Sequence, residues 1–389
     1  MKACALRTFP EFPFILAVFQ LAATWMACGQ VTFSWQTIGD VGNPSMVTRP
    51  SDAVNVAVTV GSMDHEYAIS KYEVSNAQYV AFLNAVASQG DPHGLYNPSA
   101  EIHELGGIVR FGTGPFTYAS KQGREDYPVN FVGAFDAARF VNWLHNGQGQ
   151  ADTEDGVYDM LEEHLLRKAG ARVFLPSENE WHKAAYYDPR STSEGGPSND
   201  DHYWLYPSQS ESIPNKAVID GAGNITNPQP NLANWGRSNP YGLCKVHTGG
   251  PGTETYYGVM HMGGNVVEWI EDRNSQDPSR YDIRGGDWEK GHWDQRNDFI
   301  NSTSPSHEST YLGIRLAATL AYAGGGIDAA GNPIQPGPIV PDPIDPDPGN
   351  PDPGNPDPGN PDPGNPDPGN PDPGNPDPVD PVIPDPVAP

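Results

Sequence analysis

Cysteine is scarce in this chain of 389 residues, which contains only Cys4, Cys28 and Cys244. The first two lie in an N-terminal targeting segment, so the mature chain is expected to keep Cys244 alone. One cysteine cannot form a disulfide framework, so the folded part must be held together by its core, with metal binding as a possible addition. We interpret Cys244 as a small buried hydrophobic residue, with a reactive thiol as the alternative.

Positive charge is also scarce, because 22 Lys and Arg face 49 Asp and Glu and the formal net charge is −27. The sequence shows no basic patch, no P-loop and no dinucleotide-binding motif. A nucleic-acid partner is therefore excluded on composition and charge.

Long apolar runs are limited to the N-terminal segment, from about Phe12 to Ala27. Lys2 and Arg7 precede this run, Gln20 interrupts it, and small residues follow up to Gly29. This layout predicts a signal peptide over residues 1–29, with an uncleaved anchor or a lipoprotein at Cys28 as alternatives. We therefore expect a secreted protein, or one of the periplasm or cell envelope, without a membrane span after cleavage.

Glycine and proline are abundant, with 43 and 42 residues, and much of this excess lies at the C-terminal end. The sequence PDPGN repeats six times between Pro346 and Asn375, and from residue 328 onward there are twelve Asp and no Lys or Arg. Proline at this density forbids helix and sheet, so residues 324–389 are predicted to be a disordered, acidic, low-complexity tail. Weak cation binding or attachment to an envelope partner are the alternatives to a plain spacer.

The middle of the chain carries signals of regular structure. Residues 31–60 alternate apolar and polar residues around Gly and Pro, which indicates strands and turns. Ser75-x-x-Gln78 and Ser177-x-x-Glu180 are capping-box patterns that predict two helix starts, and an apolar stripe predicts another helix that ends near Gly147.

Three glycine- and tryptophan-rich motifs follow each other near the end of this folded part. They read GNVVEW (Gly264–Trp269), RGGDW (Arg284–Trp288) and GIRL (Gly313–Leu316). In this order they resemble the formylglycine-generating-enzyme family, the sulfatase-modifying-factor domain, whose members usually read GNVWEW, RGGSW and GFR. The resemblance extends over about residues 32–318. It implies an α+β fold similar to a C-type lectin, with a small antiparallel sheet, few short helices and extensive structured loops.

The resemblance also implies calcium sites. In the first motif, the ligands would be the carbonyls of Gly264 and Val266 and the carboxylate of Glu268, a donor mixture that Ca²⁺ accepts. A second calcium loop would use Asn234. The upstream side chain, usually Asn or Asp in the family, is His261 here, which departs from the pattern. A structural Glu268 is the alternative. Arg284 and Arg315 are predicted to form buried ion pairs, with Glu268 or Asp272 as candidate partners, or to bond loop carbonyls.

The family's copper chemistry is not expected. Formylglycine generators bind Cu(I) through two cysteines between the second and third motifs, and the interval Glu289–Thr310 contains none. His292, Asp294 and His307 lie in this interval, where two histidines and a carboxylate could form another transition-metal site or remain ordinary polar loop residues.

Two functions follow as hypotheses. The first is an exported, non-catalytic binding or scaffold module that recognises a protein, peptide or glycan through the face around residues 285–312. The alternative is a metal-dependent oxidoreductase, related to formylglycine-generating enzyme, that acts on an exported protein or a small thiol.

Overall fold

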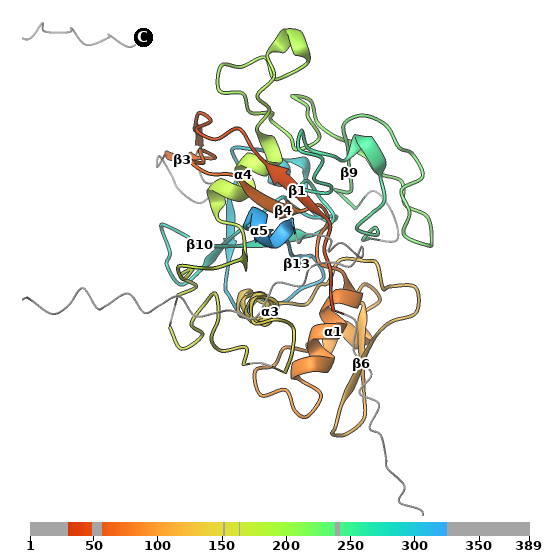
Figure 1. Ribbon diagram of the computed structural model, residues 1–389. Coiled ribbons are helices and arrows are strands. Elements are labelled where there is room, and N and C mark those ends of the chain that lie inside the picture. Colours follow the sequence, from red (N-terminus) through yellow and green to blue (C-terminus); the bar gives the residue numbers. More distant parts are fainter. Residues whose placement is uncertain (1–29, 49–56, 151, 163, 238–241, 325–389) are drawn as a thin grey trace, which may run out of the picture. The chain divides into compact units, whose positions relative to one another are not determined.

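A computed structural model describes residues 30–48, 57–150, 152–162, 164–237 and 242–324 (Figure 1). The predicted signal peptide, and the predicted acidic tail beyond residue 324, lie outside these described residues. Within them, no helix is both long and apolar enough to cross a membrane.

The first four-stranded sheet joins segments from the beginning, middle and end of the described chain. Its strand order is β1-β4-β14-β7, and all neighbours are antiparallel. The strands are β1 (Trp35–Ile38), β4 (Tyr67–Ser70), β7 (Val173–Phe174) and β14 (Ala317–Ala318). Ala317 pairs with Ile69 on one side and Phe174 on the other, so the C-terminal strand lies between two earlier ones.

The second four-stranded sheet contains parts of all three sequence motifs. Its order is β12-β11-β10-β13, with a parallel pairing between β10 and β13 and antiparallel pairings elsewhere. The strands are β10 (Val267–Arg273), β11 (Tyr281–Arg284), β12 (Asn301–Thr303) and β13 (Leu312–Ile314). Glu268 is paired with Arg284 on one side and with Gly313 on the other, which brings the three motifs together.

Three two-stranded ladders complete the strand inventory of the described residues. They are β2 (Met46–Thr48) with β3 (Val58–Val60), β5 (Ile108–Phe111) with β6 (Thr117–Ser120), and β8 (Asn215–Lys216) with β9 (Leu232–Ala233).

The helices begin where the capping patterns predict. Ser75 caps α1 (Asn76–Val86) and Ser177 caps α4 (Glu178–Tyr186), each within a complete capping box. The stripe before Gly147 forms α3 (Ala134–His145). The other helical segments are α2 (Ser99–Ile102), α5 (Leu320–Ala323) and the 3-10 turns η1 (Thr192–Glu194), η2 (Gly250–Gly252) and η3 (His292–Gln295).

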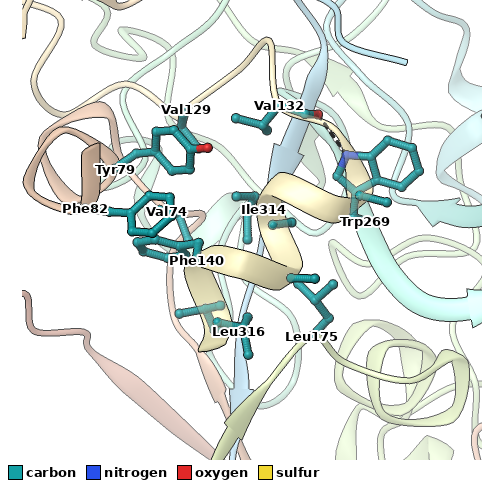
Figure 2. Close-up of a cluster of buried hydrophobic side chains, with 14 of the residues drawn as sticks. Val74, Tyr79, Phe82, Val129, Val132, Phe140, Leu175, Trp269, Ile314 and Leu316 are labelled. Atoms are coloured by element: carbon teal, nitrogen blue, oxygen red, sulfur yellow. Dashed lines mark hydrogen bonds between the residues drawn. The ribbon is translucent and has the colours of Figure 1, made fainter. Parts of the chain in front are cut away.

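The largest hydrophobic cluster packs α1 and α3 against strands of both sheets (Figure 2). Phe82 and Phe140 meet edge to face with ring centroids 5.4 Å apart, and Trp269 of β10 donates to the carbonyl of Val132 at 3.0 Å. The predicted α+β class, with short helices, small sheets and long structured loops, is confirmed.

Candidate functional site: a polar cleft beside the second sheet

A cavity of about 210 Å³ opens beside the second sheet. Its walls come from β10 and β11, from the turn after β11, and from the segment between the second and third motifs. The lining residues are Val267, Arg280, Ile283, Gly286, Asp287, Lys290, Asp294, Phe299, Asn301, Ser302, Thr303, His307 and Tyr311.

The Gly-Gly turn of the second motif shapes one wall of this cleft. Gly286 has a φ of 67°, in the left-handed region that favours glycine. A Cβ at this position would lie 3.0 Å from the carbonyl carbon and Cβ of Asp294. Glycine therefore allows the turn to approach η3 closely and places Asp287 near Asp294.

Asp287 and Asp294 form an acidic pair at the cleft. Asp287 is buried, and its Oδ1 accepts hydrogen bonds from the backbone N–H groups of Glu289 at 2.7 Å and Lys290 at 3.0 Å. Burial raises the pKa of Asp287 to about 7, with a further increase from the charge of Asp294, although the Lys290 backbone bond and ammonium oppose the shift. Burial also raises the pKa of Asp294. Asp287 can therefore bind and release a proton near neutral pH.

Other residues that line the cleft offer hydrogen-bonding groups. His307 Nδ1 lies 2.8 Å from the hydroxyl of Thr303, and Arg280 donates through Nε to the hydroxyl of Ser302 at 2.9 Å. The Lys290 ammonium lies 5.9 Å from the ring centroid of Tyr311. The cleft thus combines carboxylates, cationic groups, hydroxyls and an aromatic ring, and none of its lining residues is a cysteine.

Glu268 and Arg315, from the first and third motifs, form a buried ion pair behind this sheet. Arg315 Nε lies 2.9 Å from both carboxylate oxygens of Glu268, and Arg315 Nη2 lies 2.7 Å from Oε1. Trp181 Nε1 also donates to Oε2 at 2.7 Å. The sequence-based prediction that Arg315 pairs with Glu268 is confirmed.

Comparison with known proteins agrees with this arrangement of motifs. The model of the family described as "Sulfatase-modifying factor enzyme 1-like domain" matches residues 42–320. The chain belongs to this family. No curated protein matches the chain.

Solved structures with a similar fold include Treponema denticola variable protein 1, which is 18% identical in sequence. The match covers 75% of this chain and 97% of that protein's chain, with a TM-score of 0.45. CarF is also 18% identical, covers 74% of this chain and 98% of its own, and has a TM-score of 0.45. PvdO from Pseudomonas aeruginosa is 17% identical, covers 71% of this chain and 92% of its own, and has a TM-score of 0.39.

The calcium site that membership of the sulfatase-modifying-factor family implies at the first motif would lie against an existing ion pair. Both oxygens of Glu268 are occupied by Arg315, and the guanidinium already supplies the positive charge that a cation would bring. A Ca²⁺ ion at Glu268 would have to lie against this fixed positive charge. This geometry favours a structural Glu268, the alternative considered from the sequence, and calcium binding at the first motif stays a prediction.

Asn234, the predicted ligand of the second calcium loop, lies directly after β9 and beside the first motif. Asn234 forms a parallel bridge with Gly264, and a Cβ at Gly264 would lie 2.2 Å from the Asn234 carbonyl oxygen. Asn234 Nδ2 donates to the Gly242 carbonyl at 2.8 Å. Burial lowers the pKa of His261 to about 4, and its Nε2 lies 2.7 Å from the Thr248 carbonyl. Across the described part of the chain, no three His, Cys, Asp or Glu side chains form a group able to hold a metal ion.

His292, Asp294 and His307 are not brought together as a set of metal ligands. Asp294 and His307 line the cleft, whereas His292 does not. The His292 Nδ1 lies 2.8 Å from the hydroxyl of Tyr206, and its ring packs against Trp235 and Trp293. The alternative transition-metal site predicted from the sequence named these three side chains as its ligands.

The sequence did not indicate the burial of two acids, Asp287 and Glu73. Asp287 stands where family members usually have the Ser of RGGSW, and its position after Gly-Gly could have marked it as a cleft residue. Glu73, just before α1, is buried and accepts from Asn265 Nδ2 at 3.0 Å. Burial raises the pKa of Glu73 to about 8, against the lowering effect of Arg315. No local sequence pattern indicated its burial.

Proposed function

We propose that this sulfatase-modifying-factor-like domain is an exported, non-catalytic binding module whose cleft recognises a protein, peptide or glycan. One observation carries the proposal. The segment in which formylglycine generators would hold their thiolates forms a wall of the cleft, and its lining residues are Lys290, Asp294, Phe299, Asn301, Ser302, Thr303 and His307.

These side chains do not fit Cu(I), which requires soft thiolate ligands. Cys244 offers no substitute, because it is buried and hydrogen-bonded within the core rather than exposed at the cleft. Burial also raises the pKa of the Cys244 thiol well above its ordinary value, which disfavours the reactive thiolate. Oxidation of a substrate cysteine by the family's copper mechanism is therefore not part of the proposal.

The size and chemistry of the cleft suit recognition of a small part of a larger ligand. A cavity of about 210 Å³ is below the usual range for a drug-sized molecule, so it would accept one side chain or one sugar unit. The carboxylates, hydroxyls and cationic groups around it can fix the orientation of such a unit through several hydrogen bonds. The proposed export and the acidic tail suit a domain displayed outside the cytoplasm on a solvated spacer.

The test combines a binding screen with a catalytic assay on the full mature chain. We expect a ligand to emerge from panels of peptides and oligosaccharides, and we expect no formylglycine on a cysteine-containing sulfatase peptide supplied with copper and oxygen. Asp294→Ala removes a cleft carboxylate with no side-chain hydrogen bond in the described structure, whereas Asp64→Ala removes an exposed acid outside the lining and serves as the control.

Isothermal titration should show weaker binding, by about fivefold or more, for Asp294→Ala and unchanged binding for Asp64→Ala, because only the first variant loses a hydrogen-bonding group at the site. Multiple-turnover oxidation of the peptide would refute the non-catalytic function. Equal affinity of both variants and the parent protein would place the ligand elsewhere.

A further inference from the structure

Three aromatic rings, two from η3 and one from the segment after β9, contact one another in a row. Trp293 is 57% exposed, and its indole lies 4.3 Å from the His292 ring at an interplanar angle of 36°. The His292 ring lies 5.5 Å from Trp235 at 77°. We call Trp235, His292 and Trp293 the aromatic row.

The aromatic row is held in place at both ends and at its centre. The Lys216 ammonium lies 4.4 Å from the Trp235 ring centroid, and the Arg296 guanidinium lies 5.4 Å from that of Trp293. At the centre, the hydroxyl of Tyr206 lies 2.8 Å from His292 Nδ1 and orients the imidazole. Burial and the nearby Arg296 lower the pKa of His292, which favours a neutral ring at pH 7. A ligand that packs on the exposed indole would thus meet a preorganised surface.

The cationic groups beside the aromatic row already bind acceptors of the protein itself, and this affects which ligand charge the row can accept. Arg296 donates to both carboxylate oxygens of Asp298, at 2.8 and 2.6 Å, and Lys216 donates to the Gly236 carbonyl at 3.2 Å. The chain as a whole carries a net charge of −27. A polyanion would therefore be repelled by the molecule and would find few free cations at the row, whereas a neutral ligand meets neither obstacle.

The backbone of Trp293 adjoins the cleft lining. Trp293 lies in the chain between Lys290 and Asp294, both of which line the cavity. A ligand chain that packs on Trp293 can therefore extend toward a pocket that offers an ammonium and a carboxylate.

We propose that the aromatic row is a carbohydrate-binding surface for a neutral sugar chain that runs from Trp293 toward the cleft. This proposal rests on the binding function proposed above and narrows its ligand class. One face of a pyranose presents C–H groups that can pack on an indole, as apolar surface packs on aromatic rings. Its hydroxyls can then bond to Lys290, Asp294 and Asn301 at the cleft, which supply both donors and acceptors.

The experiment uses the full mature chain and four probes: cellohexaose, chitohexaose, xylohexaose and mannohexaose. Isothermal titration gives the affinity, and tryptophan fluorescence reports packing on an indole. We expect at least one hexasaccharide to bind and to shift the emission. Trp293→Ala should weaken that binding by about five- to tenfold, because ring packing beyond simple burial has this magnitude.

Two matched variants separate recognition from general damage. Trp293→Phe keeps an aromatic surface and should retain affinity within about threefold. Phe111→Ala removes a ring of the same 57% exposure from β5 and should leave binding unchanged. Thermal melting of each variant checks that the fold is intact.

Failure of all four hexasaccharides to bind, or equal binding by Trp293→Ala and the parent protein, would overturn the carbohydrate assignment. Binding of a peptide at the cleft in the absence of sugar binding would overturn it as well, while leaving the proposed binding function in place. Absence of both peptide and sugar ligands would count against both proposals.

Discussion

Glu73 shows how one buried side chain can make the stability of this domain depend on pH. It is 1% exposed, accepts from Asn265 Nδ2 at 3.0 Å, and its other oxygen has no hydrogen-bond partner within the described structure. The charged groups that act on it are Arg315, which favours its ionised form, and Glu268, which opposes it. The effect of desolvation on the pKa is larger than the effect of either charge, and the pKa of Glu73 rises from 4.5 to about 8.

The pKa shift of Glu73 predicts the direction of a pH effect. The folded state binds the Glu73 proton more tightly than the unfolded state, so this contribution to stability is complete below about pH 4.5 and is lost as the pH rises through about 8. Glu73→Gln keeps a carbonyl oxygen for Asn265 and removes the titration. We expect the variant to gain stability relative to the parent between pH 5 and 9, by roughly 1 kcal/mol or more, since one pKa unit corresponds to about 1.4 kcal/mol.

Urea unfolding of both proteins at several pH values measures this difference. Glu104→Gln, at an exposed position, is the control and should follow the parent curve. Parallel curves for Glu73→Gln and the parent would show that Glu73 is ionised throughout and that its burial is compensated.

Side-chain direction is the main reason why candidate ligands could not be selected from the sequence. His292 and Asp294 are two residues apart in the same 3-10 turn, yet only Asp294 lines the cleft, while His292 bonds to Tyr206. The Tyr206 contact spans 86 positions in the chain and leaves no local pattern. Residue types and spacing alone therefore suggested a metal site whose members the fold separates.

At the scale of the elements, the pairing of β10 with β13 is stabilised by a charge pair across the same strands. Glu268 lies in β10, and Arg315 immediately follows β13. Arg315 also donates to the carbonyls of Ser70 and Met260, both at 2.8 Å, so it connects the second sheet with the end of β4. Such a guanidinium cannot be removed without leaving buried acceptors unpaired.

Arg315→Met should therefore be strongly destabilising, by about 3–5 kcal/mol, because it leaves the Glu268 carboxylate buried without its partner. The control is Arg237→Met, which removes an arginine that is 65% exposed and ion-paired with Glu289. An exposed pair of this kind contributes at most about 1 kcal/mol. Chemical unfolding at pH 7 gives the free energy of unfolding of both variants. If the two variants lose a similar amount, the buried pair contributes little to stability.

The helices could be predicted from the sequence because their signals are local. In α4, Ser177 and Glu180 are three residues apart and complete a capping box by themselves, and the same holds for Ser75 and Gln78 in α1. The sheets could not be predicted in the same way. The pairing of Trp269 with Ile314, or of Ala317 with Phe174, depends on contacts between distant segments, and strands of two or three residues carry little periodicity of their own.

At the scale of the whole molecule, the described domain is closed by its last strands. β14 lies between β4 and β7, and β13 places the fully buried Leu312 and Ile314 in the main hydrophobic cluster. The family match ends at residue 320, close to the end of the described residues. The folded unit should therefore need everything up to about residue 324 and nothing that follows.

Two C-terminal truncations test this boundary. Ending the chain after Gly324 removes the PDPGN repeats, whose Pro and Asp residues offer little apolar surface to bury, so the unfolding midpoint should stay within about 2 °C of the parent value. Ending it after Thr310 removes β13, Arg315 and β14 together. This truncation should abolish cooperative unfolding, because the first sheet loses β14, which lies between β4 and β7, and the second sheet loses β13, which pairs with β10. Circular dichroism melts distinguish the outcomes. A marked loss of stability in the longer truncation would mean that the acidic tail packs on the domain, and the spacer role proposed for it would then have to be abandoned.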